Sequence, residues 1–189
     1  MAKTQVLDAF VLHAHRRGLV RGKPGLHRET RSRLDRLIQA YNQYDGPKPK
    51  IVLPQGVLVV QFEEEYLLDR GIPRSQIVSR LSSLGAWIGR GSEVKEALKL
   101  GADEGLWRLG FVSNATHLRR IRRLAAYWSY HLGWHIAFTP IPSVCILSWG
   151  WRVIETCLAY PYTVLLDRGN RGRLFRMSRK TVSVHVGGG

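Results

Sequence analysis

The chain has 189 residues, which is enough for one complete hydrophobic core and short for two. Its hydrophobic fraction of 44% is ordinary, and its long uncharged stretch at residues 132–151 contains His135, Pro140 and Pro142, so a membrane-spanning helix is not expected. The charge is unusual, because 29 Lys and Arg residues stand against 14 Asp and Glu residues, a net charge of +15. Such a chain is attracted to polyanions such as nucleic acid or an anionic membrane surface.

Short apolar runs alternate along the chain with longer segments in which apolar residues recur every three or four positions. In the first of these longer segments, Leu34, Leu37 and Tyr41 fall on one face of a helix. Gly, Pro, Ser and Asn separate the segments. In chain order, we expect a strand at 5–13, a helix at 29–44, a strand at 50–54, a helix at 60–70, a strand at 76–80, a helix at 92–100 with Ser92 as its N-cap, a strand at 108–112, a turn at 113–116, a helix at 117–132, a strand at 134–138, a helix at 149–166 and an edge strand at 181–186.

This alternation predicts an α/β fold, a three-layer Rossmann-like domain with a mostly parallel sheet of about five strands and helices on both faces. Residues 1–166 would form this single domain, and residues 167–189 a basic C-terminal extension. In open parallel sheets, ligands bind beyond the carboxyl ends of the strands. We therefore look for a site in the segments that follow the expected strands.

The segment from Ser113 to Arg120 has the strongest site chemistry. A strand ends and a helix begins there, so backbone N–H groups and the helix dipole present partial positive charge. Ser113 and Asn114 add a hydroxyl and an amide, and His117 and Arg120 lie on the same side of one helical turn. This combination suits a phosphate or a carboxylate, and His117 is the best candidate acid or base. The alternative is a helix cap, a packed histidine and a solvated arginine.

Histidine and cysteine point to no further chemistry. His13 and His15 fall on one face of the expected first strand, but no third ligand is placed by spacing, so we interpret them as loop polarity and predict no metal site. Cys145 and Cys157 lack the spacing of a metal or redox motif and are expected to be buried thiols, which fits an intracellular, reducing compartment. The sequence identifies no cofactor.

Several segments together resemble the SanA/ElyC/YdcF-like family, whose members have a Rossmann-like domain of mostly unassigned function. Residues 7–12, L-D-A-F-V-L, are similar to the family's opening strand, and residues 33–36 to the start of its first helix with a lead arginine. Residues 71–73, G-I-P, resemble its G-V-P segment. Residues 112–120, V-S-N-A-T-H-L-R-R, resemble V-T-S-x-x-H-x-x-R, which is the most specific part of a resemblance that covers most of the chain.

The resemblance implies a site for a small anionic ligand of phosphate or nucleotide type, with His117 as its catalytic residue if a reaction occurs. The chain departs from the family where Gln55-Gly56 replaces Gly-Gly, where Val59 stands near the expected acid, and where Ser92-Glu93 replaces T-x-E-N. These departures affect residues that would carry catalysis and leave the expected fold unchanged. The implied ligand-binding residues are Arg33, Gln55, Gly56, Ser83, Ser92, Glu93, Ser113, Asn114 and Arg120.

A second class of function is open from the residues alone. An enzyme-like domain with incomplete motifs and a strongly basic surface could be a non-catalytic accessory subunit of a large assembly, either a mitochondrial or bacterial ribosome-like particle or a membrane respiratory complex. The arginines of its C-terminal basic segment are separated by residues such as Asn170, Ser178 and Gly, a pattern that suits contact with RNA phosphates better than base recognition. The expected polyanion contacts are Arg119, Arg122, Arg123, Arg171, Arg173, Arg176, Arg179 and Lys180.

Overall fold

The centre of the molecule is a five-stranded sheet in which all neighbouring strands run parallel. The computed structural model describes residues 6–13, 19–20, 23–54, 57–79, 91–144, 149–159 and 161. From one edge of the sheet to the other, the strands are β5 (Ile77–Ser79), β4 (Lys50–Leu53), β1 (Ala9–Leu12), β6 (Arg108–Asn114) and β7 (Ala137–Ser143).

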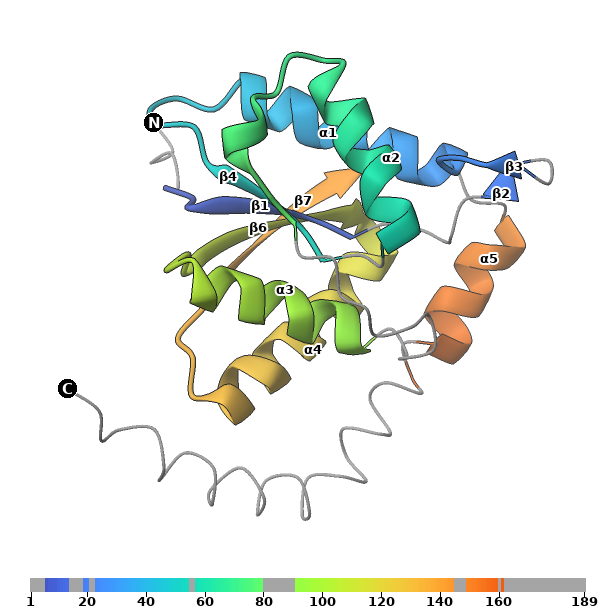
Figure 1. Cartoon of the computed structure of the whole chain (residues 1–189). Helices are drawn as coiled ribbons and strands as arrows, with labels where there is room; N and C mark the ends of the chain where they lie inside the picture. Colours follow the sequence, from blue (N-terminus) through green and yellow to red (C-terminus); the bar gives the residue numbers. More distant parts are fainter. Residues whose placement is uncertain are drawn as a thin grey trace.

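In the described part of the chain, two helices cover each face of this sheet (Figure 1). The helices α1 (Arg28–Asn42) and α2 (Val57–Leu68) pack on one face, and α3 (Gly91–Asp103) and α4 (Ala115–Leu132) pack on the other. This arrangement confirms the predicted three-layer, Rossmann-like α/β fold. No helix in the described part of the chain has the length and apolar composition needed to cross a bilayer.

The central strand β1 contributes side chains to both cores. Phe10 and Leu12 belong to the core beneath α1 and α2, whereas Ala9 and Val11 belong to the core beneath α3 and α4. All four residues are almost completely buried. A parallel strand covered on both faces needs apolar residues at every position, which is why this segment is a continuous apolar run.

The path of the chain reverses beside β1. After β1, the chain moves outward through β4 to β5, and it then returns through α3 to place β6 on the other side of β1. The crevice between β1 and β6 is therefore the topological switch point of the sheet. Open α/β sheets bind ligands at this place, beyond the carboxyl ends of the strands.

The boundary between β6 and α4 differs from the prediction. We expected a turn at 113–116, but β6 continues through Asn114 and α4 begins at the next residue, Ala115. The Asn114 side chain accepts a hydrogen bond from the backbone N–H of His117 and so caps the helix directly. At the other end, α4 stops at Gly133, whose φ of 67° is the left-handed conformation that glycine adopts most easily.

The last strand also differs from the prediction. We expected it at 134–138, whereas β7 spans Ala137–Ser143 and contains Pro140 and Pro142. Proline usually interrupts a strand, which is why the pattern placed the end of the strand before Pro140. Because β7 is an edge strand, its outward-facing positions need no N–H donor and tolerate proline.

Smaller differences occur at other boundaries. The helix expected from residue 60 begins at Val57, and α3 begins at Gly91, so Ser92 lies in the first turn and is not the N-cap. A single turn of 3-10 helix, η1 (Arg74–Gln76), precedes β5. The helix expected at 149–166 is α5 (Trp149–Ile154) followed by a π-helical segment, η2 (Glu155–Ala159). Residues 167–189, with the expected edge strand at 181–186, lie outside the described residues.

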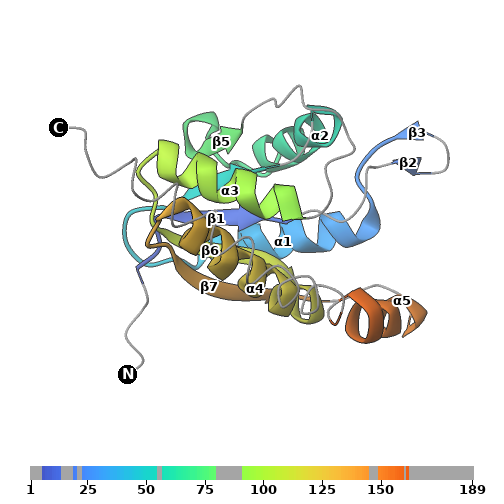
Figure 2. The ribbon, with the colours of Figure 1, turned by 90° about the horizontal axis from the view of Figure 1, so that it is seen from below.

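Two small elements lie beyond the carboxyl ends of the strands. A hairpin of β2 (Leu19–Val20) and β3 (Lys23–Pro24) follows β1, and α5 follows β7. Figures 1 and 2 both show the hairpin and α5 at the same end of the molecule. The hairpin was not predicted, because two-residue strands leave no alternating pattern in the sequence. Cys157 in η2 is exposed, so its predicted burial was wrong, and Cys145 lies outside the described residues.

Candidate functional site

Polar residues follow the two strands that border the switch point. His13 comes directly after β1, and Ser113 and Asn114 are the last two residues of β6. Leu12 is paired in register with Val112, so His13 and Ser113 lie at the same level. Because side chains alternate along a strand, His13 and Ser113 are on the α3 and α4 face, and Asn114 is on the α1 and α2 face.

On the α1 face, Glu29 and Arg33 form a buried ion pair. Their nearest atoms, Glu29 Oε1 and Arg33 Nη2, are 3.2 Å apart, and both side chains are 1% exposed. Arg33 Nη1 also donates to the carbonyl oxygen of His13 at 2.5 Å. Burying a charge is costly unless it is paired, and this pair has a second function as a link between α1 and the end of β1.

Asn114 joins this ion pair to the start of α4. Its Nδ2 donates to Glu29 Oε1 at 3.1 Å, and its Oδ1 accepts from the backbone N–H of His117 at 2.8 Å. The buried amide therefore uses both of its ends. It fixes the N-terminus of α4 relative to α1 across the carboxyl edge of the sheet.

On the α3 and α4 face, the end of β1 and the first turn of α4 bring two histidines together. The rings of His13 and His117 meet edge to face, with centroids 4.7 Å apart. His13 Nε2 lies 3.3 Å from Glu93 Oε2 at the start of α3, and Arg120 Nη2 lies 2.9 Å from His117 Nδ1. His13, His117 and Arg120 are all at least nine-tenths buried.

A further acid, Glu63 in α2, is completely buried. Neither of its carboxylate oxygens has a hydrogen-bond partner among the described residues. Burial raises the pKa of this carboxyl well above its usual range, and the negative charges of Glu93 and Glu64 raise it further. Both effects act in favour of the neutral form of this carboxyl.

Two serine hydroxyls also lack partners in the described part of the chain. Ser113 Oγ and Ser143 Oγ are buried, and they stand near the carboxyl ends of the neighbouring strands β6 and β7. Buried polar atoms are nearly always hydrogen-bonded in native proteins. A ligand with hydrogen-bonding oxygens would give such atoms a partner.

The structure brings most of the predicted site residues that it describes to one place. Arg33, Glu93, Ser113, Asn114, His117 and Arg120 all lie at the carboxyl edge. The guanidinium of Arg33, which was predicted to contact the ligand, is paired with Glu29 and the carbonyl of His13. Ser92 lies in the first turn of α3, while Gln55, Gly56 and Ser83 lie outside the described residues.

Sequence reasoning missed three residues of this cluster. His13 was interpreted as loop polarity, although it directly follows a fully buried strand. Glu29 stands four residues before Arg33, the usual spacing of a helical ion pair. Glu63 is one of three consecutive glutamates, yet it shares a helix face with the buried Val60 and Leu67, and that periodicity distinguishes it from its neighbours.

The predicted polyanion contacts have mixed placements. Arg119 and Arg122 are exposed on α4, and Arg123 is half-buried beside them. The other predicted contacts, Arg171, Arg173, Arg176, Arg179 and Lys180, lie outside the described residues. Among the described residues, no three His, Cys, Asp or Glu side chains gather in a way that could hold a metal ion.

Comparisons of the chain with protein-family models, with curated proteins and with solved structures found no match. The resemblance to the SanA/ElyC/YdcF-like family therefore stays a prediction that rests on the motifs quoted above.

Proposed function

We propose that this chain binds a small anionic ligand, of phosphate or nucleotide type, at the switch point between β1 and β6. The observation that carries the proposal is the burial of His117 and Arg120 in the first turns of α4, beside His13. Replacing buried ionic groups with apolar ones often stabilises a protein. Ionisable groups that persist at a crevice where sheets of this type bind ligands are therefore candidates for a function.

The chemistry around α4 favours an anion. Asn114 accepts the N–H of His117, and the preceding N–H groups of Ala115 and Thr116 belong to the positive end of an 18-residue helix. The Arg120 guanidinium and the buried Ser113 hydroxyl add donors on the same side of the sheet. Phosphate and carboxylate groups bind at helix N-termini for these reasons.

The histidine pair is the part of the site that could transfer a proton. Glu93 lies beside His13, and His13 contacts His117 through its ring. If the ligand reacts, His117 is the proposed acid or base, and Glu93 orients the neighbouring imidazole.

The test is thermal unfolding with inorganic phosphate and with adenosine monophosphate as probes. Wild-type protein should gain about 2.7 kcal/mol of stability at a probe concentration one hundred times its Kd. His117→Ala and Arg120→Gln should lose this gain, whereas Arg122→Gln, an exposed arginine of the same helix, should keep it. Equal stabilisation of His117→Ala and wild type would show that the site is elsewhere.

A second candidate function is that of an accessory subunit in a large assembly. It is supported by exposed apolar side chains around α5, where Val144, Trp149 and Leu158 are 75%, 79% and 65% exposed, on a chain with a net charge of +15. Sedimentation of native extract with and without ribonuclease tests it. Fast sedimentation that collapses with ribonuclease supports a ribonucleoprotein subunit, fast sedimentation that persists supports a protein or membrane assembly, and slow sedimentation in both runs contradicts this candidate.

A further inference from the structure

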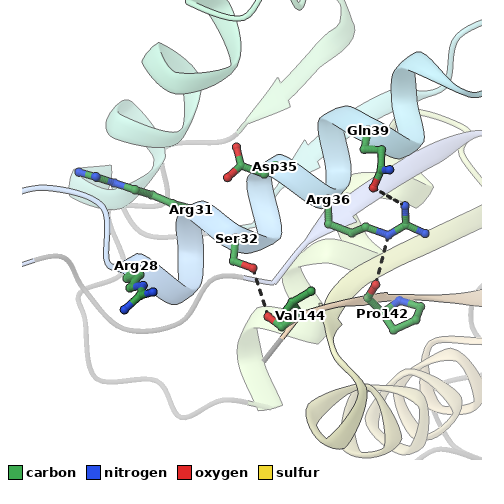
Figure 3. A pocket seen from close by; sticks show the side chains of 8 residues that line it. All are labelled: Arg28, Arg31, Ser32, Asp35, Arg36, Gln39, Pro142 and Val144. Atoms are coloured by element: carbon green, nitrogen blue, oxygen red, sulfur yellow. Dashed lines mark hydrogen bonds between the residues drawn. The ribbon is translucent and has the colours of Figure 1, made fainter. Parts of the chain in front are cut away.

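A shallow groove of about 870 Å³ lies on the outer side of α1, away from the buried cluster. We call it the α1 groove. Its floor includes Pro142 and Val144 at the end of β7 (Figure 3). Three arginines of α1 line it, Arg28, Arg31 and Arg36.

Hydrogen bonds fix the helix wall of the groove to the strand. Arg36 Nε donates to the carbonyl oxygen of Pro142 at 3.2 Å, and Ser32 Oγ donates to the carbonyl oxygen of Val144 at 3.1 Å. Arg36 Nη1 donates to Gln39 Oε1 at 2.8 Å. All of these acceptors are neutral. They hold Arg36 in place without compensating its positive charge.

Asp35 is an acid among the described lining residues, and its carboxylate contacts residues that do not line the groove. Its Oδ1 accepts from the Tyr66 hydroxyl at 2.7 Å and lies 3.9 Å from Arg70 Nε. Arg70 also stacks on the Tyr66 ring, with its Cζ 3.4 Å from the ring centroid. Asp35 is thus paired with Tyr66 of α2 and with Arg70 in the turn that follows this helix. Neither Arg28 nor Arg31 forms an ion pair with a carboxylate in the part of the chain that the structure describes.

The spacing of these charges indicates an elongated partner. Arg28 and Arg36 are eight positions apart on a helix, which places their backbones about 12 Å apart along the helix axis. Figure 3 shows the Arg28 and Arg36 side chains at opposite ends of the lining, so a chain of phosphates matches this row better than a single phosphate does. No aromatic side chain is among the described lining residues, so the groove has no surface on which bases would stack.

We propose that the α1 groove binds the phosphate backbone of a single-stranded nucleic acid, without selecting its sequence. The contacts would come from guanidinium groups, which hydrogen-bond phosphate oxygens in a bidentate manner. This site is independent of the small-anion site, because the small-anion site is formed by α4 and the ends of β1 and β6 on the other face of the sheet. The groove also differs from the polyanion contacts expected from the sequence. Those of the expected residues that the structure describes lie on α4, across the sheet from α1.

The experiment measures binding of a fluorescein-labelled oligouridylate of about 12 nucleotides by anisotropy, at salt concentrations between about 50 and 200 mM. The variant is Arg28→Gln with Arg31→Gln, and the matched control is Arg119→Gln with Arg122→Gln, which removes two exposed arginines from α4. The α1 variant should bind at least about tenfold more weakly at low salt. Its log–log salt slope should be shallower by about 1.4, because each lost phosphate contact on a single strand changes the slope by about 0.7.

The control should change the affinity and the slope much less. Equal losses in both variants would show that affinity follows net charge alone, and a larger loss in the control would place the nucleic acid on α4. A polyglutamate of equal length that competes as well as the oligouridylate, or a wild-type protein that does not bind at about 50 mM salt, would also overturn the proposal. Unchanged thermal unfolding of the α1 variant ensures that lost binding is not lost folding.

Discussion

Arg31 and Arg33 stand two positions apart on α1, and their surroundings are opposite. Arg33 is 1% exposed and is held by Glu29 and the carbonyl of His13. Arg31 is exposed and lines the α1 groove. Helical periodicity turns one arginine toward the carboxyl edge of the sheet and the other toward solvent. A run of basic residues in a sequence is therefore not a single feature, because its members can serve stability and binding separately.

The largest effect should follow from removing the buried arginine. Arg33→Met leaves the Glu29 carboxylate buried without its counter-ion, and we expect a loss of about 3–5 kcal/mol in the free energy of unfolding, measured with urea. Glu29→Met added to this variant should restore most of the loss, because the double change removes both charges. A loss below about 1 kcal/mol in the single variant would show that Arg33 resembles the exposed arginines after all.

A gain of stability should follow from replacing the buried acid. Glu63→Met removes two buried oxygens that have no described partner, and we expect a gain of about 1–3 kcal/mol at neutral pH. The raised pKa of Glu63 means that the native state holds this proton more tightly than the unfolded state does, so its contribution is most favourable at low pH and is lost as pH rises. The advantage of the variant should therefore grow with pH. Glu65→Met, an exposed neighbour, should show neither effect.

A smaller loss of stability should follow from changing Asn114, which links α1 to the start of α4. Asn114→Ala removes the cap of α4 and the hydrogen bond to Glu29, and we expect a loss of about 0.5–2 kcal/mol in chemical denaturation. Asn114→Asp retains an acceptor for the His117 N–H but places a second carboxylate against Glu29. If Asn114→Asp is as stable as wild type, the contact with Glu29 is unimportant and only the cap matters.

The smallest effect should come from the groove arginines. Arg28→Gln with Arg31→Gln should change the free energy of unfolding by less than about 0.5 kcal/mol, because neither side chain is buried or ion-paired in the described structure. Urea denaturation beside the Arg33→Met variant gives a direct comparison within one helix. A loss comparable to that of Arg33→Met would remove the distinction between the two faces of α1.

Much of the fold was predictable because each element carries its own local pattern. The buried residues Leu34, Leu37 and Tyr41 follow the helical period, and the apolar run of β1 reflects burial on both faces. The prolines of β7 misled the prediction, because the position of a strand at the edge of a sheet cannot be read from its own residues.

The candidate site was predictable only where its residues are close in sequence. His117 and Arg120 are one helical turn apart, so their contact follows from spacing. The hydrogen bond between Glu29 and Asn114 joins residues 85 positions apart, and no local pattern indicates it. The role of Arg33 could not be assigned for the same reason. Its partner His13 follows strand β1, 20 positions earlier in the chain, and the pairing of the guanidinium becomes visible only in three dimensions.

The edge strand β7 has a consequence for how this sheet can grow. Pro140 and Pro142 have no N–H group to offer a further strand, and the carbonyls of Pro142 and Val144 already accept hydrogen bonds from Arg36 and Ser32. The opposite edge, β5, is three residues long in the part of the chain that the structure describes. Neither edge therefore presents the row of donors and acceptors on which strand addition and aggregation depend. A protein that joins this domain would contact its helices and loops rather than extend its sheet.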